Sequence, residues 1–330
     1  MKRTDLPQTN SDSISLPTGI TVIVPVYNSQ ETLNALLDRM TPMLQETQSV
    51  FEVILVNDGS RDKSWSVIEN LKGKYPFIVA YDMMRNYGQH NALLCGIRNA
   101  RFDKIVTLDD DLQNPPEEVP KMLAKLAEGF DVVYGKPQAM QHGLWRNLAS
   151  KITKALLQKA MGADTAANIS AFRVFRTAVR DAFSTYRSPF VSIDVLLTWG
   201  TTRFTAIEVK HDPRTVGVSN YTLKKLMVHA LNMVTGFSTW PLQLASMIGF
   251  LFTIIGMLLL VVVVINRIVN GGTVAGFAFL ASAIAIFSGA QLFALGIMGE
   301  YLARLHFRTM ERPTYTIRSR IDSDPVEPKN

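Results

Sequence analysis

The sequence predicts an α/β protein whose sheet is mostly parallel, followed by a hairpin of two membrane-spanning helices. Through the first 225 residues, short apolar β-branched runs alternate with helical patterns across short links. Such alternation is typical of a parallel sheet with helices on both faces. Between residues 226 and 299 the only formally charged side chain is that of Arg267. A surface in water needs more polar groups than that, so this part is expected to lie in lipid.

The strands and helices of the first part are expected in regular order. Strands are expected at 20–26, 51–56, 77–81, 104–108, 131–134 and 204–209. Helices are expected at 31–44, 63–72, 90–100 and 116–128. Two further stretches, 144–161 and 221–235, have one apolar and one polar face. The first fits either an ordinary surface helix or a helix in the membrane interface, and the second is expected in the interface.

Two uncharged stretches, 242–265 and 277–298, are long enough to cross a bilayer. A helix rises about 1.5 Å per residue, and the hydrocarbon core is roughly 30 Å thick. Basic residues precede the first stretch and follow the second: Lys224, Lys225, Arg304, Arg308, Arg312, Arg318 and Arg320. Positively charged flanks usually stay in the cytoplasm, so both chain ends are expected there. The alternative is the two-helix core of a soluble protein.

The expected organisation is a disordered tail over 1–18, a globular α/β domain over 19–220, an interfacial helix over 221–240, the hairpin over 241–299 and a basic cytoplasmic segment over 300–330. No apolar core of a secretory signal opens the chain, so the globular domain is expected on the cytoplasmic side of the inner membrane. Cys95 is the only cysteine, which excludes an intramolecular disulfide and suits a reducing compartment. The net charge is a modest +6 and no basic stripe with interleaved aromatic residues is present, which argues against nucleic acid as a partner.

The chemistry is expected at the acidic run Asp109-Asp110-Asp111-Leu112-Gln113, which follows the apolar strand at 104–108. Two carboxylates one residue apart can share a hard divalent cation, and that cation can hold a diphosphate. A solvated acidic loop is the alternative. Asp58 follows the strand at 51–56, and the carboxyl ends of parallel strands meet at one edge, so Asp58 is expected beside the acidic run. It suits a contact to a base or ribose, or it caps the following turn.

Several longer motifs occur together in one order. Four lie in the first part: Val24-Pro25-Val26-Tyr27-Asn28, Asn57-Asp58-Gly59-Ser60, Arg85-Asn86-Tyr87-Gly88 and Asp109-Asp110-Asp111-Leu112-Gln113-Asn114-Pro115-Pro116. Others lie in or beside the hairpin: Phe237-Ser238-Thr239-Trp240-Pro241-Leu242, Gly289-Ala290-Gln291, Gly299-Glu300-Tyr301-Leu302-Ala303-Arg304 and Arg312-Pro313-Thr314-Tyr315. Through these motifs, residues 18–316 resemble the polyprenyl-phosphate branch of the inverting glycosyltransferases with the GT-A fold. That branch includes dolichyl-phosphate mannose synthase and the undecaprenyl-phosphate glucosyl- and aminoarabinose transferases.

The resemblance implies an enzyme that moves a glycosyl group, with inversion, from a nucleotide diphosphate-sugar such as a UDP-sugar to a polyprenyl phosphate such as undecaprenyl phosphate. Its product would serve cell-envelope glycans or the modification of lipopolysaccharide. The resemblance also implies Mg²⁺ or Mn²⁺ on Asp109, Asp111 and Gln113, with Asp109, Asp111 and Arg214 catalytic. The donor nucleotide is expected on Pro25, Tyr27, Asn28, Asp58, Arg85 and Asp110. The acceptor phosphate is expected on Lys136, Arg146, Ser150, Arg214 and Ser219. The lipid bilayer is an expected partner, and so is a second copy of the chain in a homo-oligomer.

The acceptor decides whether a general base is needed. A phosphate whose pKa is about 6 is already charged near neutral pH and needs none. Asp194 would be a base only for a hydroxyl acceptor, and is otherwise a structural carboxylate.

Two alternative functions stay open at this point. One is a processive or hydroxyl-directed transferase, although a processive enzyme needs a Gln-x-x-Arg-Trp motif and more spans, and this chain has Trp145-Arg146 in the reverse order. The other is a non-catalytic membrane protein that binds a sugar nucleotide. Asp109, Asp111, Arg146 and Arg214 argue against it.

Overall fold

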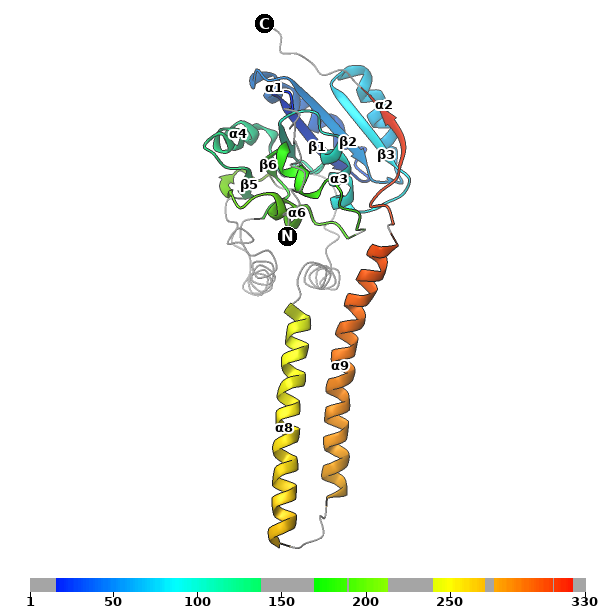
Figure 1. Cartoon of the computed structure of the whole chain (residues 1–330). Coiled ribbons are helices and arrows are strands. Elements are labelled where there is room, and N and C mark those ends of the chain that lie inside the picture. The colour runs from blue at the N-terminus through cyan, green and yellow to red at the C-terminus, as the bar shows by residue number, and fades with distance from the viewer. Residues whose placement is uncertain are drawn as a thin grey trace, which may run out of the picture.

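The computed structural model describes residues 16–137, 169–188, 190–212, 240–270, 276–310 and 312–322. An α/β domain is joined to two long helices that extend side by side from one end of it (Figure 1). Most of the tail expected over 1–18 and the amphipathic stretches at 144–161 and 221–235 lie outside the described residues.

The domain is organised around an eight-stranded sheet in the order β7-β5-β6-β4-β1-β2-β3-β8. In chain order, the strands are β1 (Ile20–Val26), β2 (Phe51–Asn57), β3 (Ile78–Met83), β4 (Lys104–Thr107), β5 (Val132–Pro137), β6 (Arg173–Arg176), β7 (Phe204–Val209) and β8 (Ile317–Ile321). The four central strands are parallel, with Val22 of β1 opposite Val53 of β2 and Val106 of β4. β6 and β8 run antiparallel to their neighbours. The sequence therefore predicted the parallel centre correctly.

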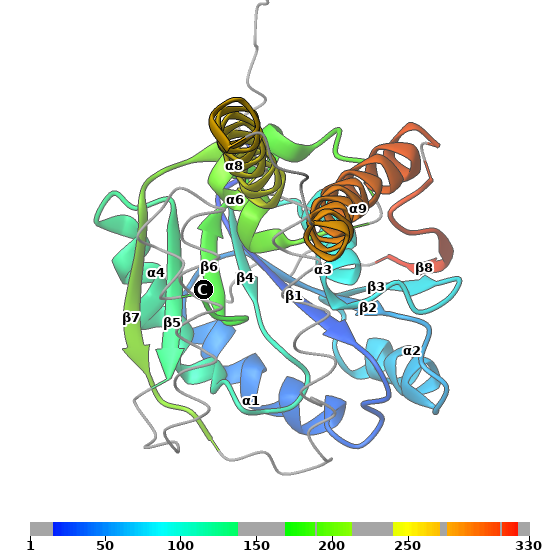
Figure 2. The same ribbon diagram turned by 90° about the horizontal axis from the view of Figure 1, so that it is seen from below.

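Helices cover both faces of the sheet, as the alternating pattern predicted. They are α1 (Leu33–Glu46), α2 (Ser64–Lys74), α3 (Gln89–Asn99), α4 (Val119–Ala127) and α6 (Ile193–Gly200), with 3-10 turns η1 (Pro116–Glu118) and η3 (Thr177–Phe183). Successive strand residues point to opposite faces, so Val22 and Val24 pack in one core with α1, α2 and α4. Ile23 packs in the other core with α3 and α6. Figure 2 shows these two groups of helices on opposite sides of the sheet.

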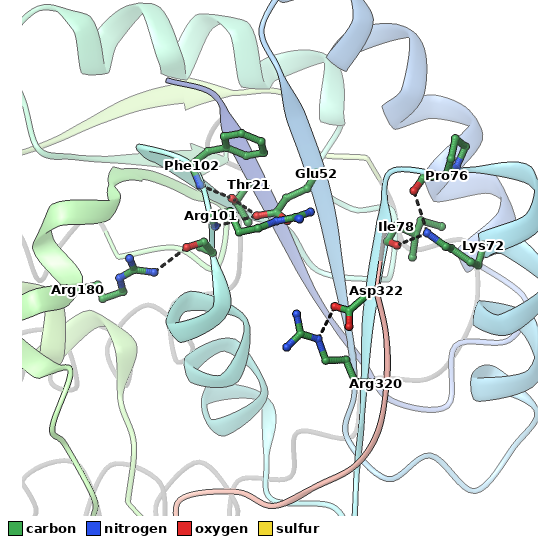
Figure 3. Close-up of polar contacts among 11 residues, drawn as sticks. Thr21, Glu52, Lys72, Pro76, Ile78, Arg101, Phe102, Arg180, Arg320 and Asp322 are labelled. Carbon is green, nitrogen blue, oxygen red and sulfur yellow. Dashed lines mark hydrogen bonds and ion pairs between the residues drawn. The ribbon is translucent and has the colours of Figure 1, made fainter. Parts of the chain in front are cut away.

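An ion pair between a buried carboxylate and a partly exposed arginine joins the amino-terminal ends of the central strands. The Glu52 side chain is 1% exposed, and its Oε2 lies 2.6 Å from Arg101 Nε. Its Oε1 accepts hydrogen bonds from Thr21 Oγ1 (2.8 Å) and from the backbone N–H of Arg101 (2.9 Å) (Figure 3). This contact joins β1, β2 and the loop that precedes β4, at the edge of the sheet opposite to the carboxyl ends of the strands.

Two strands were not predicted from the sequence. β6 is four residues long, and it lies between β4 and β5 with both neighbours antiparallel. β8 is Ile317–Ile321, an edge strand with two arginines, and charged edge strands lack the apolar run by which buried strands are recognised. Arg318 of β8 donates to Asp82 Oδ2 (3.2 Å) and to Met84 O (2.9 Å). A part of the segment expected over 300–330 is thus a strand of the domain's own sheet.

The two long helices are α8 (Trp240–Asn270) and α9 (Phe277–Thr309). They contain the candidate membrane spans Pro241–Asn266 and Ile286–His306, and none of the residues in the most apolar window of either span is buried. The predicted stretch 242–265 lies within α8, and the predicted stretch 277–298 lies within α9, which continues as a helix through Glu300 and Arg304. Apolar side chains such as Leu258 (61% exposed) face outward. The alternative of a soluble two-helix core is therefore wrong.

Candidate active site

A cavity of about 380 Å³ lies at the carboxyl ends of β1, β2 and β4, where the topology of a parallel sheet predicts it. Its lining consists of the ends of these strands, the loops that follow them, the loop between β3 and α3, and the start of α3: Pro25, Val26, Tyr27, Asp58, Asn86, Gly88, Gln89, Asp109, Asp110, Asp111 and Gln113. The acidic run and Asp58 therefore lie together, as the sequence predicted.

Asp110 ties the acidic run to the loop after β1. Its Oδ2 accepts hydrogen bonds from the backbone N–H of Tyr27 (3.1 Å) and from the hydroxyl of Ser29. Burial raises the pKa of the Asp110 carboxyl, although these two hydrogen bonds oppose the rise. Two residues in the joined loops, Asn28 (φ 56°) and Leu112 (φ 61°), adopt left-handed backbone conformations. Such conformations cost of order 1–3 kcal/mol and persist only where surrounding contacts hold them, and Asp110 supplies such contacts.

Asp109, Asp111 and Gln113 present oxygen ligands to the same cavity. Asp109 Oδ1 accepts a hydrogen bond from Gln89 Nε2 (2.6 Å), and Asp111 Oδ1 accepts one from the backbone N–H of Gln113 (3.1 Å). Within the described part of the chain, no three His, Cys, Asp or Glu side chains are grouped to hold a metal. Mg²⁺ in proteins is commonly held by one or two carboxylates together with substrate phosphates. The residues present therefore fit a cation that is shared with a diphosphate.

Asp58 holds the loop that follows β3. Its Oδ1 accepts the backbone N–H of Tyr87 (2.7 Å) and its Oδ2 that of Gly88 (2.8 Å). Burial raises the pKa of Asp58 to about 6, in spite of these two hydrogen bonds. The alternative role foreseen for Asp58, capping its own turn, belongs instead to Asn57, whose Oδ1 accepts the N–H of Ser60 (3.4 Å).

Gly59 is required by the same loop. Its φ is +63°, and a Cβ on it would lie 2.5 Å from the Arg85 carbonyl carbon and 2.6 Å from the Asn86 nitrogen. A side chain would thus push the loop away from β2. The motif at 57–60 therefore holds the motif at 85–88 through a carboxylate and a glycine.

Of the six residues predicted to bind the donor nucleotide, four line the cavity: Pro25, Tyr27, Asp58 and Asp110. Asn28 is not among the lining residues, and its Oδ1 accepts the backbone N–H of Arg61 (2.8 Å). Arg85 lines an adjoining cavity instead. The prediction missed Asn86, Gly88 and Gln89. Asn86 and Gly88 belong to the motif Arg85-Asn86-Tyr87-Gly88. Gln89 begins α3, the helix that follows β3, and this position in the chain could have predicted that it lies at the cavity.

Few of the predicted acceptor residues can be placed. Lys136 lies exposed near the end of β5, opposite Glu208 of β7, and is not a lining residue of the cavity. Arg146, Ser150, Arg214 and Ser219 lie outside the described residues. Asp212, the last described residue before Arg214, donates its backbone N–H to Gln113 O (2.9 Å). The last residue of this described range therefore lies beside the acidic run.

Asp194 forms a buried ion pair away from the cavity. Its Oδ1 accepts hydrogen bonds from Arg173 Nη1 (2.8 Å) and Tyr134 Oη (3.1 Å), and the side chains of Arg173 and Asp194 are 2% and 9% exposed. Burial, together with the charge of Asp194, raises the pKa of the Tyr134 phenol well above its ordinary value. This geometry is that of a structural carboxylate.

The mostly parallel sheet with helices on both faces and an acidic cavity at its strand ends is a GT-A-like α/β fold, as the resemblance implied. The sequence profile of glycosyl transferase family 2 matches residues 21–184. The chain belongs to this family.

The chain has curated relatives that are named "undecaprenyl-phosphate 4-deoxy-4-formamido-L-arabinose transferase". The protein of Proteus mirabilis is 35% identical over 303 residues, which cover 90% of this chain and 92% of that protein. The protein of Pseudomonas fluorescens is 33% identical over 312 residues, which cover 94% and 92%. Among solved structures, the chain is similar to Mycobacterium tuberculosis glucosyl-3-phosphoglycerate synthase with Mn²⁺ and UDP-glucose, at 16% identity and a TM-score of 0.48 over 66% of this chain and 77% of that one.

Proposed function

We propose that this protein transfers a glycosyl group from a nucleotide diphosphate-sugar to undecaprenyl phosphate at the cytoplasmic face of the inner membrane, with inversion at the anomeric carbon. The observation that carries the proposal is the joining of Asp109, Asp111 and Gln113 with Asp58 in one cavity at the strand ends. The names of the relatives, at 35% identity over 90% of the chain, support the acceptor and a modified pentose as the transferred group.

In this proposal Asp109, Asp111 and Gln113, which line the cavity, would hold Mg²⁺ or Mn²⁺ together with the donor diphosphate. A bound cation would neutralise charge on the departing nucleoside diphosphate. Asp110 and Asp58 act through position, because Asp110 holds the loop at 27–29 and Asp58 holds the loop at 87–88. Pro25 and Tyr27, which line the cavity, then contact the nucleotide.

The acceptor side needs positive charge rather than a general base. An undecaprenyl phosphate oxygen is already ionised near neutral pH, so attack on the anomeric carbon requires alignment and charge neutralisation. Arg146, Ser150, Arg214 and Ser219 are the residues proposed for that role. The contact between Asp212 and Gln113 supports it for Arg214, since the chain enters that segment beside the acidic run. The enclosure of Asp194 by Arg173 and Tyr134 supports a mechanism without a carboxylate base.

The proposed topology has the domain and both chain ends in the cytoplasm, with the link between α8 and α9 on the other side. Pairing between β8, which follows α9, and β3, which precedes α8, supports it. Two strands of one sheet must lie on the same side of a membrane, so the chain between them crosses an even number of times. Assembly into a homo-oligomer stays a prediction.

The proposal is tested with the purified full-length protein, a panel of UDP-sugars and undecaprenyl phosphate. We expect a lipid product whose mass equals the acceptor plus one glycosyl residue, formed only when a divalent cation is present. Release of UDP without any glycosylated lipid, across the whole panel, would exclude the polyprenyl acceptor. Elongation of the product by repeated units would favour a processive enzyme instead.

A further inference from the structure

A second cavity, of about 280 Å³, adjoins the active-site cavity, and Asn86 lines both. Its walls come from three distant parts of the chain. Arg85, Tyr87 and Asn91 belong to the loop before α3 and to α3 itself, Phe190 precedes α6, and Arg312 and Thr314 follow α9. Arg85, for which a nucleotide contact was predicted, lines this cavity and not the one that contains Asp58 and the acidic run.

Among the described residues, the lining of this cavity includes two arginines and no carboxylate. In the part of the chain that the structure describes, neither Arg85 nor Arg312 forms an ion pair. The Arg85 guanidinium lies 4.5 Å from the centre of the Tyr87 ring. The pKa of the Tyr87 phenol is below its ordinary value. Burial raises this pKa, but hydrogen bonds with Thr316 and Arg85, together with the charges of Arg85 and Arg312, lower it by more than burial raises it. Two guanidinium groups at one cavity repel each other, and an anion between them would remove the repulsion.

The position of the cavity relative to the membrane follows from α9. This helix contains a candidate membrane span and ends at Thr309, and Arg312 of the cavity follows three residues later. Arg304 of α9 lies 5.0 Å from the centre of the Phe190 ring, so the helix and the cavity wall are in contact. The cavity therefore lies where the chain leaves the candidate span and enters the domain.

One buried side-chain oxygen of the cavity wall has no hydrogen-bond partner among the described residues. Asn91 is 7% exposed, its Nδ2 donates to Tyr87 O (2.7 Å), and its Oδ1 accepts no hydrogen bond from any described residue. An unpaired buried acceptor costs about 1–3 kcal/mol. A ligand with a hydroxyl donor next to its phosphate would satisfy it. A polyprenyl phosphate has no such hydroxyl, whereas the glycerol headgroup of a phospholipid has two.

We propose that this cavity binds an anionic glycerophospholipid with a hydroxylated headgroup. Its phosphate lies between Arg85 and Arg312, a headgroup hydroxyl donates to Asn91 Oδ1, and its acyl chains leave past Phe190 toward α9. The inference rests on the proposed membrane location, and not on the sugar or on the acceptor. It also gives the lipid an effect on the active site, because the loop it contacts is the one that Asp58 holds.

The test measures lipid binding to the full-length protein in neutral detergent by native mass spectrometry, with short-chain lipids added. Phosphatidylglycerol, phosphatidylmethanol, phosphatidylcholine and farnesyl phosphate are the four probes. We expect phosphatidylglycerol to bind most tightly, and phosphatidylmethanol, which has the charge without the hydroxyls, to bind a few-fold more weakly. Farnesyl phosphate binding as tightly as phosphatidylglycerol, and competing with it, would assign the cavity to the acceptor and overturn the proposal.

The variants make the assignment specific to the two arginines. In Arg85→Gln/Arg312→Gln, the affinity for phosphatidylglycerol is expected to fall roughly tenfold or more, since each lost contact is charge-assisted. Arg203→Gln is the matched control, because Arg203 lies at the other end of the sheet, paired with Asp131. The milder Arg312→Lys keeps the charge but loses the planar fork, and an intermediate affinity is expected even if the double variant folds poorly. Unchanged phosphatidylglycerol binding in Arg312→Lys and in the double variant would rule the site out.

Discussion

The carboxylate of Asp58 accepts the backbone N–H of Gly88 at 2.8 Å, so a residue at the end of β2 holds the loop that leaves β3. Gly88 has a φ of +97°, a conformation suited to glycine. The same loop contributes Asn86 to both cavities. The position of this loop therefore links the proposed donor site to the proposed lipid site, and several expected outcomes depend on it.

Gly59→Ala is expected to weaken UDP binding and lower the melting temperature, because the new Cβ would lie 2.5 Å from the Arg85 carbonyl carbon. Gly129→Ala is the matched control: Gly129 also has a positive φ (+105°), but its Cβ would meet no atom within 4 Å. Both variants carry backbone strain of roughly 1–3 kcal/mol, and only the first displaces the loop. Calorimetry with UDP and thermal unfolding separate the two effects. Equal UDP affinity in both variants would contradict the role given to the loop.

Asp58 gives a pH dependence with a definite sign. In the unfolded chain its carboxyl ionises near pH 4, and burial raises its folded pKa to about 6. Between these values the folded state binds more protons, so the free energy of unfolding falls as the pH rises from about 4 to about 6, by at most about 3 kcal/mol, and is level above that.

Asp58→Asn removes this dependence. We therefore expect the melting temperature of the wild type, relative to Asp58→Asn, to fall as the pH rises through this window. Asp131→Asn serves as control, since hydrogen bonding from Arg203 lowers the pKa of Asp131 out of the window. If both comparisons give the same pH profile, the shift does not belong to Asp58.

Asp111→Asn should abolish transfer while leaving the fold intact. The amide keeps the shape of the carboxylate but removes one negative charge from the proposed cation site, and cation stabilisation of a leaving diphosphate is worth several kcal/mol, or roughly 100-fold or more in rate. Turnover is measured at saturating Mg²⁺ and Mn²⁺, and UDP binding with and without the metal. Asp181→Asn, at an exposed residue outside the cavity lining, should behave as wild type. Near-normal turnover in Asp111→Asn would refute the metal assignment.

Asp194→Asn is expected to reduce stability much more than activity. Breaking a buried ion pair typically costs about 3–5 kcal/mol, and Arg173, with a side chain 2% exposed, would lose its partner. Thermal unfolding should show a marked drop in melting temperature, while turnover per folded molecule stays within a few-fold of wild type. The reverse outcome, lost turnover at an unchanged melting temperature, would identify Asp194 as the base for a hydroxyl acceptor.

Cysteine labelling tests the topology. Single cysteines replace Asn270, at the end of α8, and Asp322, whose side chain is 66% exposed after β8. Both are made in a Cys95→Ala background, since Cys95 is the only cysteine. An impermeant maleimide on intact cells is expected to label position 270 alone, and position 322 only after the cells are broken. Labelling of position 322 in intact cells would be incompatible with a cytoplasmic β8.

The sequence by itself determined the elements whose signal is local. β1, β2 and β3 are mostly apolar, and each is buried along its whole length; such runs identify a strand without knowledge of its neighbours. The acidic run was recognised for the same reason, because its position after a strand follows from chain order. The predicted cavity and four of the six predicted nucleotide residues were found together there.

The tertiary structure alone decided which distant residues meet. β8 carries charged residues and becomes a strand only because the unpaired edge of β3 supplies its hydrogen bonds. The partners of Asp58 and Asp194 and the joining of Arg85 with Arg312 likewise depend on contacts between segments far apart in the chain. Such contacts cannot be predicted from local composition, because hydrogen-bond partners and burial depend on the packing of the whole domain.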